Sequence, residues 1–143
     1  MGSHRAPFVL VMLALLGSAI IVAPADLYAA KRSHPTAVAI SEFKDVAGRW
    51  SGILYGRPGG TREQDWVELT IREDGAYTLA SVRTIGVLNS SGTLRLADGR
   101  LIAQGEKAQV TITRYQANGK QFLRVEGAMA SGQPLRADLY PAA

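Results

Sequence analysis

The chain has 143 residues, with 16 Lys and Arg against 12 Asp and Glu, and it contains no cysteine. The lack of cysteine excludes disulfides, thiolate metal sites and thiol chemistry, and it leaves no thiol to carry a lipid. The charges are spread along the chain without a run of one sign, which argues against a nucleic-acid partner. A chain of this length is expected to form one domain with a single hydrophobic core.

Residues 1–25 have the organisation of a secretory signal peptide. Arg5 precedes an apolar stretch over residues 8–23, and Ala23-Pro24-Ala25 has the small-x-small form of a cleavage site. The stretch is shorter than the roughly 20 residues that span a bilayer, so an uncleaved anchor is the weaker alternative. The sequence predicts cleavage after Ala25 and export to the periplasm or the extracellular space.

Residues 26–40 lack a clear hydrophobic period and are expected to form a flexible leader. A short helix is expected next, because a capping residue, three residues at helical spacing and a stop follow one another. These residues are Ser41, then Phe43, Val46 and Ala47, and then Gly48.

The remainder of the chain reads as a meander of β-hairpins. The dipeptides Asp74-Gly75, Asp98-Gly99 and Asn118-Gly119 each separate two runs of alternating apolar and polar residues, which is a strong hairpin signal. Eight strands are predicted, at 49–56, 65–73, 76–84, 92–97, 100–104, 108–115, 121–127 and 134–140. The expected fold is all-β, an eight-stranded antiparallel up-and-down barrel over residues 41–143, with a β-sandwich as the alternative.

Alternation along the strands predicts which side chains face the core. In strand 121–127 the register is ambiguous, because Phe122 competes with Leu123 and Val125 for the inner face. The inward sets hold mostly large side chains, with Ala103 and Ala137 as the small ones, and this mixture leans toward a filled core. The other inward residues are Val67, Leu69, Ile71, Tyr77, Leu79, Leu94, Leu96, Val110, Ile112, Leu135 and Leu139.

Gly48-Arg49-Trp50, at the entry to the first strand, resembles the Gly-x-Trp signature of lipocalins and the wider calycin barrels. The resemblance implies that Trp50 packs across the closed end of the barrel, under the N-terminal helix and against an arginine. In that family the arginine lies late on the last strand, whereas Arg136 comes early on the last strand here. Arg114, at the Trp50 end of strand 108–115, is the better candidate for a cation–π partner of Trp50.

The opposite end of the meander is the expected mouth, because the longer connections gather there. A basic rim above an apolar interior would suit an amphipathic ligand with a carboxylate or phosphate head. Glu63, Asp65 and Glu106 offset this basic charge. The candidate mouth residues are Tyr55, Arg57, Arg62, Trp66, Ser81, Arg83 and Lys107.

The sequence offers little for catalysis. After cleavage the one histidine is His34, in the leader, and no nucleophile elbow, metal-binding or phosphate-binding motif occurs. A hydrolase would depend on carboxylates such as Glu73 or Glu126 alone. We therefore expect no enzyme activity, no metal and no other cofactor.

Two functional hypotheses follow. The first is an exported, monomeric, lipocalin-like protein that binds a small apolar, amphipathic or lipid-like ligand. The second is an inhibitor-like module with a filled barrel that binds a protein or an envelope component through its loops or outer face. The two hypotheses differ in the volume of the barrel interior.

Overall fold

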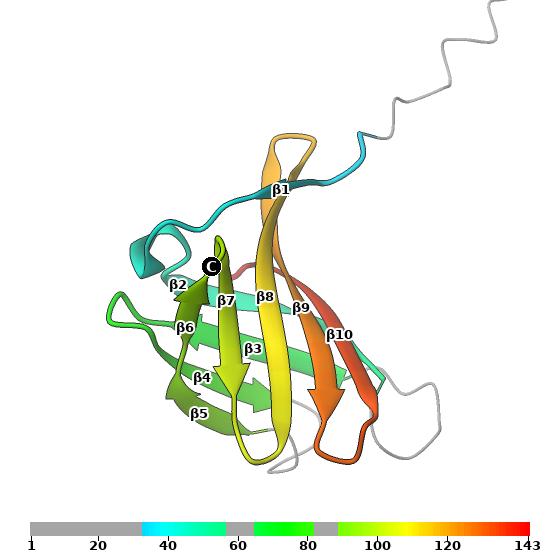
Figure 1. The fold of residues 1–143 in the computed structure, drawn as a ribbon. Coiled ribbons are helices and arrows are strands. Elements are labelled where there is room, and N and C mark those ends of the chain that lie inside the picture. The colour runs from blue at the N-terminus through cyan, green and yellow to red at the C-terminus, as the bar shows by residue number, and fades with distance from the viewer. Residues whose placement is uncertain (1–32, 57–64, 82–88) are drawn as a thin grey trace, which may run out of the picture. The chain divides into compact units, whose positions relative to one another are not determined.

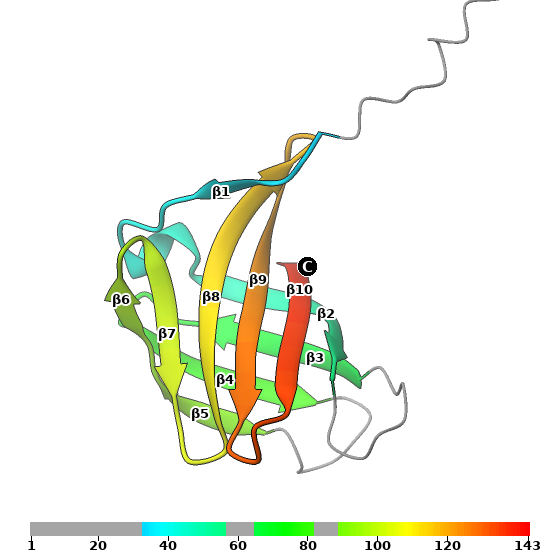
Figure 2. The ribbon, with the colours of Figure 1, turned by 45° about the vertical axis from the view of Figure 1, so that its right-hand side comes forward.

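The computed structural model describes residues 33–56, 65–81 and 89–143. These residues form an antiparallel, nearly closed β-barrel with a single short 3-10 turn (Figures 1 and 2). The elements are β1 (Thr36–Val38), η2 (Phe43–Asp45), β2 (Gly48–Tyr55), β3 (Asp65–Ile71), β4 (Ala76–Ser81), β5 (Ser90–Thr93), β6 (Arg95–Ala97), β7 (Arg100–Gln104), β8 (Ala108–Ala117), β9 (Lys120–Met129) and β10 (Pro134–Pro141).

The strand order confirms the predicted up-and-down barrel. Neighbouring strands follow the order β5-β4-β3-β2-β10-β9-β8-β7-β6, and β2 and β10 join the first and last parts of the meander. The predicted strand 92–97 is divided at Leu94 into β5, which pairs with β4, and β6, which pairs with β7. The bend at Leu94 carries the chain from one edge of the sheet to the other, and this connection brings the barrel close to closure.

The tight turns form as their residues require. In Asp98-Gly99 and Asn118-Gly119 both residues have positive φ, at 50° and 70° and at 51° and 73°, which is the backbone of a type I′ hairpin turn. At Asp74-Gly75 only Gly75 has positive φ, at 85°. All three turns connect paired antiparallel strands, as the sequence predicts.

Inward-facing residues alternate with exposed ones along the strands. The inner positions of β3 are buried from Asp65 to Ile71, and Trp66 between them is exposed. In β9 the ambiguous register is resolved by Leu123, which is fully buried in the core. Phe122 belongs to the outer face, where its ring lies between those of Tyr115 and Tyr140.

The segment before the barrel is more ordered than the sequence predicts. Residues 36–38, expected in a flexible leader, form β1 and pair with the end of β8, and Ile40 is buried. The apolar side chain of Ile40 and the free edge of β8 together explain this order. The predicted helix is a single 3-10 turn, and it begins after Glu42 rather than after Ser41. The Asp45 carboxylate accepts hydrogen bonds from the N–H groups of Ser41 and Glu42, and these bonds fix the start of the turn.

Candidate functional site

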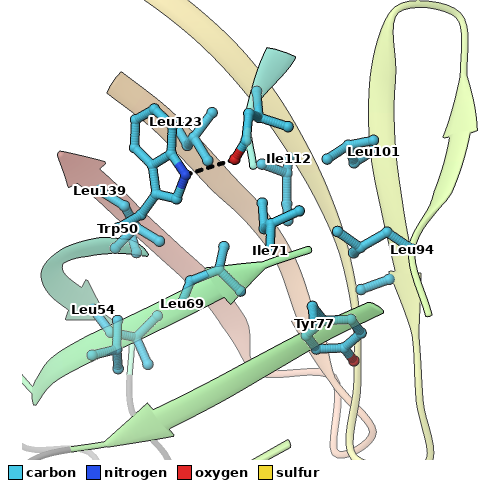
Figure 3. Packing of buried hydrophobic residues seen from close by; sticks show 14 of the residues in the cluster. Trp50, Leu54, Leu69, Ile71, Tyr77, Leu94, Leu101, Ile112, Leu123 and Leu139 are labelled. Atoms are coloured by element: carbon cyan, nitrogen blue, oxygen red, sulfur yellow. Dashed lines mark hydrogen bonds between the residues drawn. The ribbon is translucent and has the colours of Figure 1, made fainter. Parts of the chain in front are cut away.

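One end of the barrel is closed by residues 36–46, which we call the strap. Figure 3 shows Trp50 inside the barrel, with its indole Nε1 donating a 2.8 Å hydrogen bond to the carbonyl oxygen of Val46. The Arg114 guanidinium donates to the carbonyl oxygens of Ala39, at 2.8 Å, and of Asp45, at 3.4 Å. Trp50 and Arg114 therefore hold the strap through its main chain.

The expected cation–π contact between Arg114 and Trp50 is wrong. Arg114 points to main-chain oxygens of the strap, because the carbonyls of Ala39 and Asp45 are the acceptors within its reach. Within the described part of the chain, Arg124 makes the cation–π contacts instead, over Tyr115 and Phe122.

The strap also rests on two of the tight turns. The Phe43 ring lies so close to Gly75 that a Cβ there would be 2.8 Å from the ring, and the Ile40 N–H donates to the Gly99 carbonyl at 2.9 Å. The hydrogen bonds from Ser41 and Glu42 lower the pKa of the Asp45 carboxyl below its ordinary value. The end that carries the turns, Trp50 and η2 is thus closed.

The other half of the barrel contains a cavity of about 420 Å³. Most of the residues around it are apolar, and apart from the hydroxyl of Tyr77 the polar groups come from two short segments, 89–91 and 105–107. The lining residues are Leu54, Val67, Leu69, Tyr77, Leu79, Asn89, Ser90, Ser91, Ala103, Gly105, Glu106, Lys107, Ala108, Val110, Ile112, Val125, Met129, Leu135, Ala137 and Leu139.

The cavity differs from the filled core that the size of the inward side chains predicts. Large buried residues such as Trp50, Ile71 and Leu101 belong to the core but do not line the cavity, so they fill the closed half (Figure 3). The cavity walls include Ala103, Ala108 and Ala137, together with Gly105. The prediction of a filled core used the average size of the inward side chains. That average does not show that large side chains gather in one half of the barrel and small ones in the other.

A row of polar groups follows one side of the cavity. The Tyr77 hydroxyl and the Ser90 hydroxyl lie 3.3 Å apart, and the Asn89 side-chain oxygen accepts a hydrogen bond from the Ser81 N–H at 3.2 Å. The Ser81 hydroxyl donates to Oδ2 of Asp65 at 2.7 Å. Asp65 is only 1% exposed, and its Oδ1 has no hydrogen-bond partner among the residues that the structure describes.

The predicted mouth residues separate into three groups. Lys107 lines the cavity, and Ser81 lies beside it through its contacts with Asn89 and Asp65. Tyr55 and Trp66 are 47% and 40% exposed and do not line the cavity. The other three predicted residues, Arg57, Arg62 and Arg83, lie outside the described residues.

Sequence reasoning missed Asp65 and Asn89 as site residues and treated Asp65 only as a charge that offsets the basic rim. A signal for Asp65 was present, since it shares the two-residue period of Val67, Leu69 and Ile71 and therefore faces inward. No such signal exists for Asn89, although it lines the cavity. It lies in a predicted connection between two strands, where no alternation indicates which side chains face inward.

The outer face carries a second group of side chains. Phe122 stacks on Tyr115 with ring centroids 5.4 Å apart, and Tyr140, half exposed, lies on its other side. Arg124 donates two hydrogen bonds, at 2.7 and 2.9 Å, to the Asp138 carboxylate. The hydrogen bond to this carboxylate is the main cause of the raised pKa of Arg124.

In the described ranges, no three His, Cys, Asp or Glu side chains are grouped so that they could hold a metal ion. None of the helical structure in these ranges is long and apolar enough to cross a membrane. Comparisons with protein-family models, with curated proteins and with solved structures find no match to this chain.

Proposed function

We propose that this protein is an exported, non-catalytic binding protein that holds a small apolar or amphipathic molecule inside its barrel. The observation that carries the proposal is the cavity of about 420 Å³, which falls in the range of roughly 300–1,000 Å³ typical of small-molecule sites. Signal-peptide character in residues 1–25 and the resemblance of Gly48-Arg49-Trp50 to the calycin signature support the same function.

The asymmetry of the barrel supports entry from one end. The strap, Trp50 and Arg114 close one end, whereas the cavity lies in the half that contains Lys107 and Met129. Burial of an apolar ligand surface against these walls would contribute roughly 25 cal/mol per Å². An apolar body in the cavity, with a polar group near segments 89–91 and 105–107, fits this distribution.

Native mass spectrometry of the protein purified from its own host provides the direct test. We expect a co-purified lipid or metabolite, and we expect the melting temperature to rise with the concentration of a suitable ligand. A clean mass of the bare chain, together with no thermal shift across a panel of fatty acids, alcohols and amines, would contradict the proposal.

A cavity-filling variant gives a test with a matched control. Ala103→Leu adds apolar volume to the cavity wall, so we expect ligand binding to be lost or weakened at least tenfold while the protein stays folded. Ala80→Leu makes the same change at an exposed position of β4 and should leave binding unchanged. Equal binding by both variants would place the ligand elsewhere.

The exposed aromatic residues favour a second candidate, a module that binds a protein or an envelope polymer through its outer face. Tyr55, Trp66 and Tyr140 are between 40% and 50% exposed, and aromatic side chains are enriched at protein interfaces. In that case Trp66→Ala should abolish retention on isolated cell envelopes, and Ala103→Leu should not. The reverse pattern supports the cavity.

A further inference from the structure

We propose that Asp65 selects ligands whose head group donates a hydrogen bond, such as a hydroxyl or an ammonium group, and disfavours carboxylates and phosphates. This inference rests on the proposed function, since it concerns the ligand of the same cavity. It replaces the anionic head group that the basic rim suggested.

The position of Asp65 carries the first step, since it does not line the cavity itself but lies next to two residues that do. Asp65 is the first inward residue of β3, two residues before Val67, and its cross-strand partner on β2 is Leu54. Val67 and Leu54 both line the cavity. An inward carboxylate one step beyond these two walls lies where the polar part of an amphipathic ligand would be placed.

The hydrogen bonding of the carboxylate carries the second step. One oxygen of Asp65 accepts a hydrogen bond from the Ser81 hydroxyl at 2.7 Å, whereas Oδ1 is buried and meets no donor in the described part of the chain. Buried carboxylate oxygens in proteins are normally paired, because loss of water without a replacement donor is costly. The empty acceptor position therefore points to a donor that residues 33–56, 65–81 and 89–143 do not supply.

The neighbouring groups favour the same chemistry. Ser81 connects Asp65 to Asn89, which lines the cavity, and Tyr77 with Ser90 continues the polar row. An ammonium or hydroxyl group would donate to Oδ1, whereas a second carboxylate would place two negative charges together. Glu106 accompanies Lys107 at the cavity wall, so the charges of the lining residues that the structure describes balance and offer an anion no net attraction.

A head-group series tests the inference on the unmodified protein. Decylamine, decan-1-ol and decanoate share one chain length, and titration calorimetry gives a dissociation constant for each. We expect decylamine and decan-1-ol to bind at least tenfold more tightly than decanoate. Equal affinities, or a preference for decanoate, would overturn the inference and leave the proposed function standing, whereas no binding of any of the three contradicts both.

Asp65→Asn locates the preference, with Glu68→Gln as the control. The first change should weaken decylamine binding about tenfold to a hundredfold, the range of a charge-assisted hydrogen bond, and should reduce the discrimination against decanoate. Glu68 lies on the same strand but faces outward, where it pairs with Arg49, so its amide variant should keep the original order. An unchanged order in folded Asp65→Asn overturns the inference, and if that variant fails to fold, the series on the unmodified protein decides alone.

Discussion

At the scale of single residues, the closed end depends on two side chains that donate to the main chain of the strap. Trp50 is 3% exposed, fills the closed half of the barrel and donates to Val46. Arg114, on β8, donates to two further carbonyls of the strap. Each side chain thus combines packing with a hydrogen bond, and their removal should affect stability through both.

Replacement of the buried tryptophan provides the first stability prediction. We expect Trp50→Ala to lower the free energy of unfolding by roughly 3–5 kcal/mol, because a large ring leaves a cavity in the packed half. Trp66→Ala, at the exposed tryptophan, should change it by no more than about 0.5 kcal/mol. Urea unfolding monitored by circular dichroism measures both, and similar losses for the two variants would contradict the closure by Trp50.

The Asp45 carboxyl predicts a dependence of stability on pH. Its pKa is lowered from the ordinary value of 3.8 because the charged form accepts the N–H groups of Ser41 and Glu42. A lowered pKa means that the stabilisation is complete above pH 3.8 and is lost as the pH falls through the depressed value.

Asp45→Asn removes this titration and keeps one acceptor oxygen. The stability difference between the unmodified protein and Asp45→Asn should therefore be constant from pH 7 to about pH 5 and shrink below about pH 4. Urea unfolding at a series of pH values tests this expectation. A difference that grows as the pH falls would reverse the sign and contradict it.

At the scale of elements, neighbouring strands come close together where glycine takes the place of an inward side chain. A Cβ on Gly127 would lie 2.0 Å from the Gln109 carbonyl oxygen and 2.7 Å from the Cα of Val110, so β8 and β9 approach closely only because the side chain is absent. Glycine at such sites lets a strand turn a barrel corner. The close approach of β8 and β9 at this point therefore depends on one residue.

Substitution of Gly127 should accordingly be costly. We expect Gly127→Ala to destabilise the protein by about 3 kcal/mol, the upper end for overpacking, because the obstruction is backbone that cannot rotate away. Gly105→Ala, whose Cβ would meet nothing nearer than 3.9 Å, should change the free energy of unfolding by less than about 1 kcal/mol. Comparable melting temperatures for the two variants would argue against close approach at Gly127.

Local signals account for most of the elements that the sequence predicts correctly. The type I′ turns at Asp98-Gly99 and Asn118-Gly119 are chosen by the residues themselves, and alternation fixes the inner face of β3. The pairing of β1 with β8 is not local, because it depends on β8 extending to Ala117. The acceptors of Arg114 likewise depend on where the strap crosses, so the sequence identified the residue but not its contacts.

At the scale of the whole molecule, the barrel is held unevenly around its circumference. β9 pairs with β8 along its full length, and its residues 123–128 also pair with β10. In the part of the chain that the structure describes, β5 has only four paired positions, all with β4. The nearly closed sheet therefore has a weakly supported edge strand, β5, beside the cavity, since Ser90 and Ser91 line it. The size of the cavity was not predictable, because it depends on how side-chain volume is divided between the two halves.

Hydrogen exchange should reveal this difference. We expect the paired amides of β9 to exchange through global unfolding and those of β5 to exchange orders of magnitude faster through local opening. A cavity ligand should slow exchange in β5 more than in β9. Equal protection of the two strands without ligand would show that β5 is supported in solution as firmly as β9.

Because the strap is held through its main chain, its side chains are less constrained in evolution than the two side chains that hold it. The three hydrogen bonds from Trp50 and Arg114 end on peptide carbonyls of Ala39, Asp45 and Val46, and every amino acid supplies such a carbonyl. Substitutions at exposed strap positions should accumulate freely during evolution, while the two donors persist. Distant homologues should therefore be recognised by two residues, a tryptophan near the start of the first long strand and an arginine in the second half of a later strand. The residues of the strap itself should be less useful for this purpose.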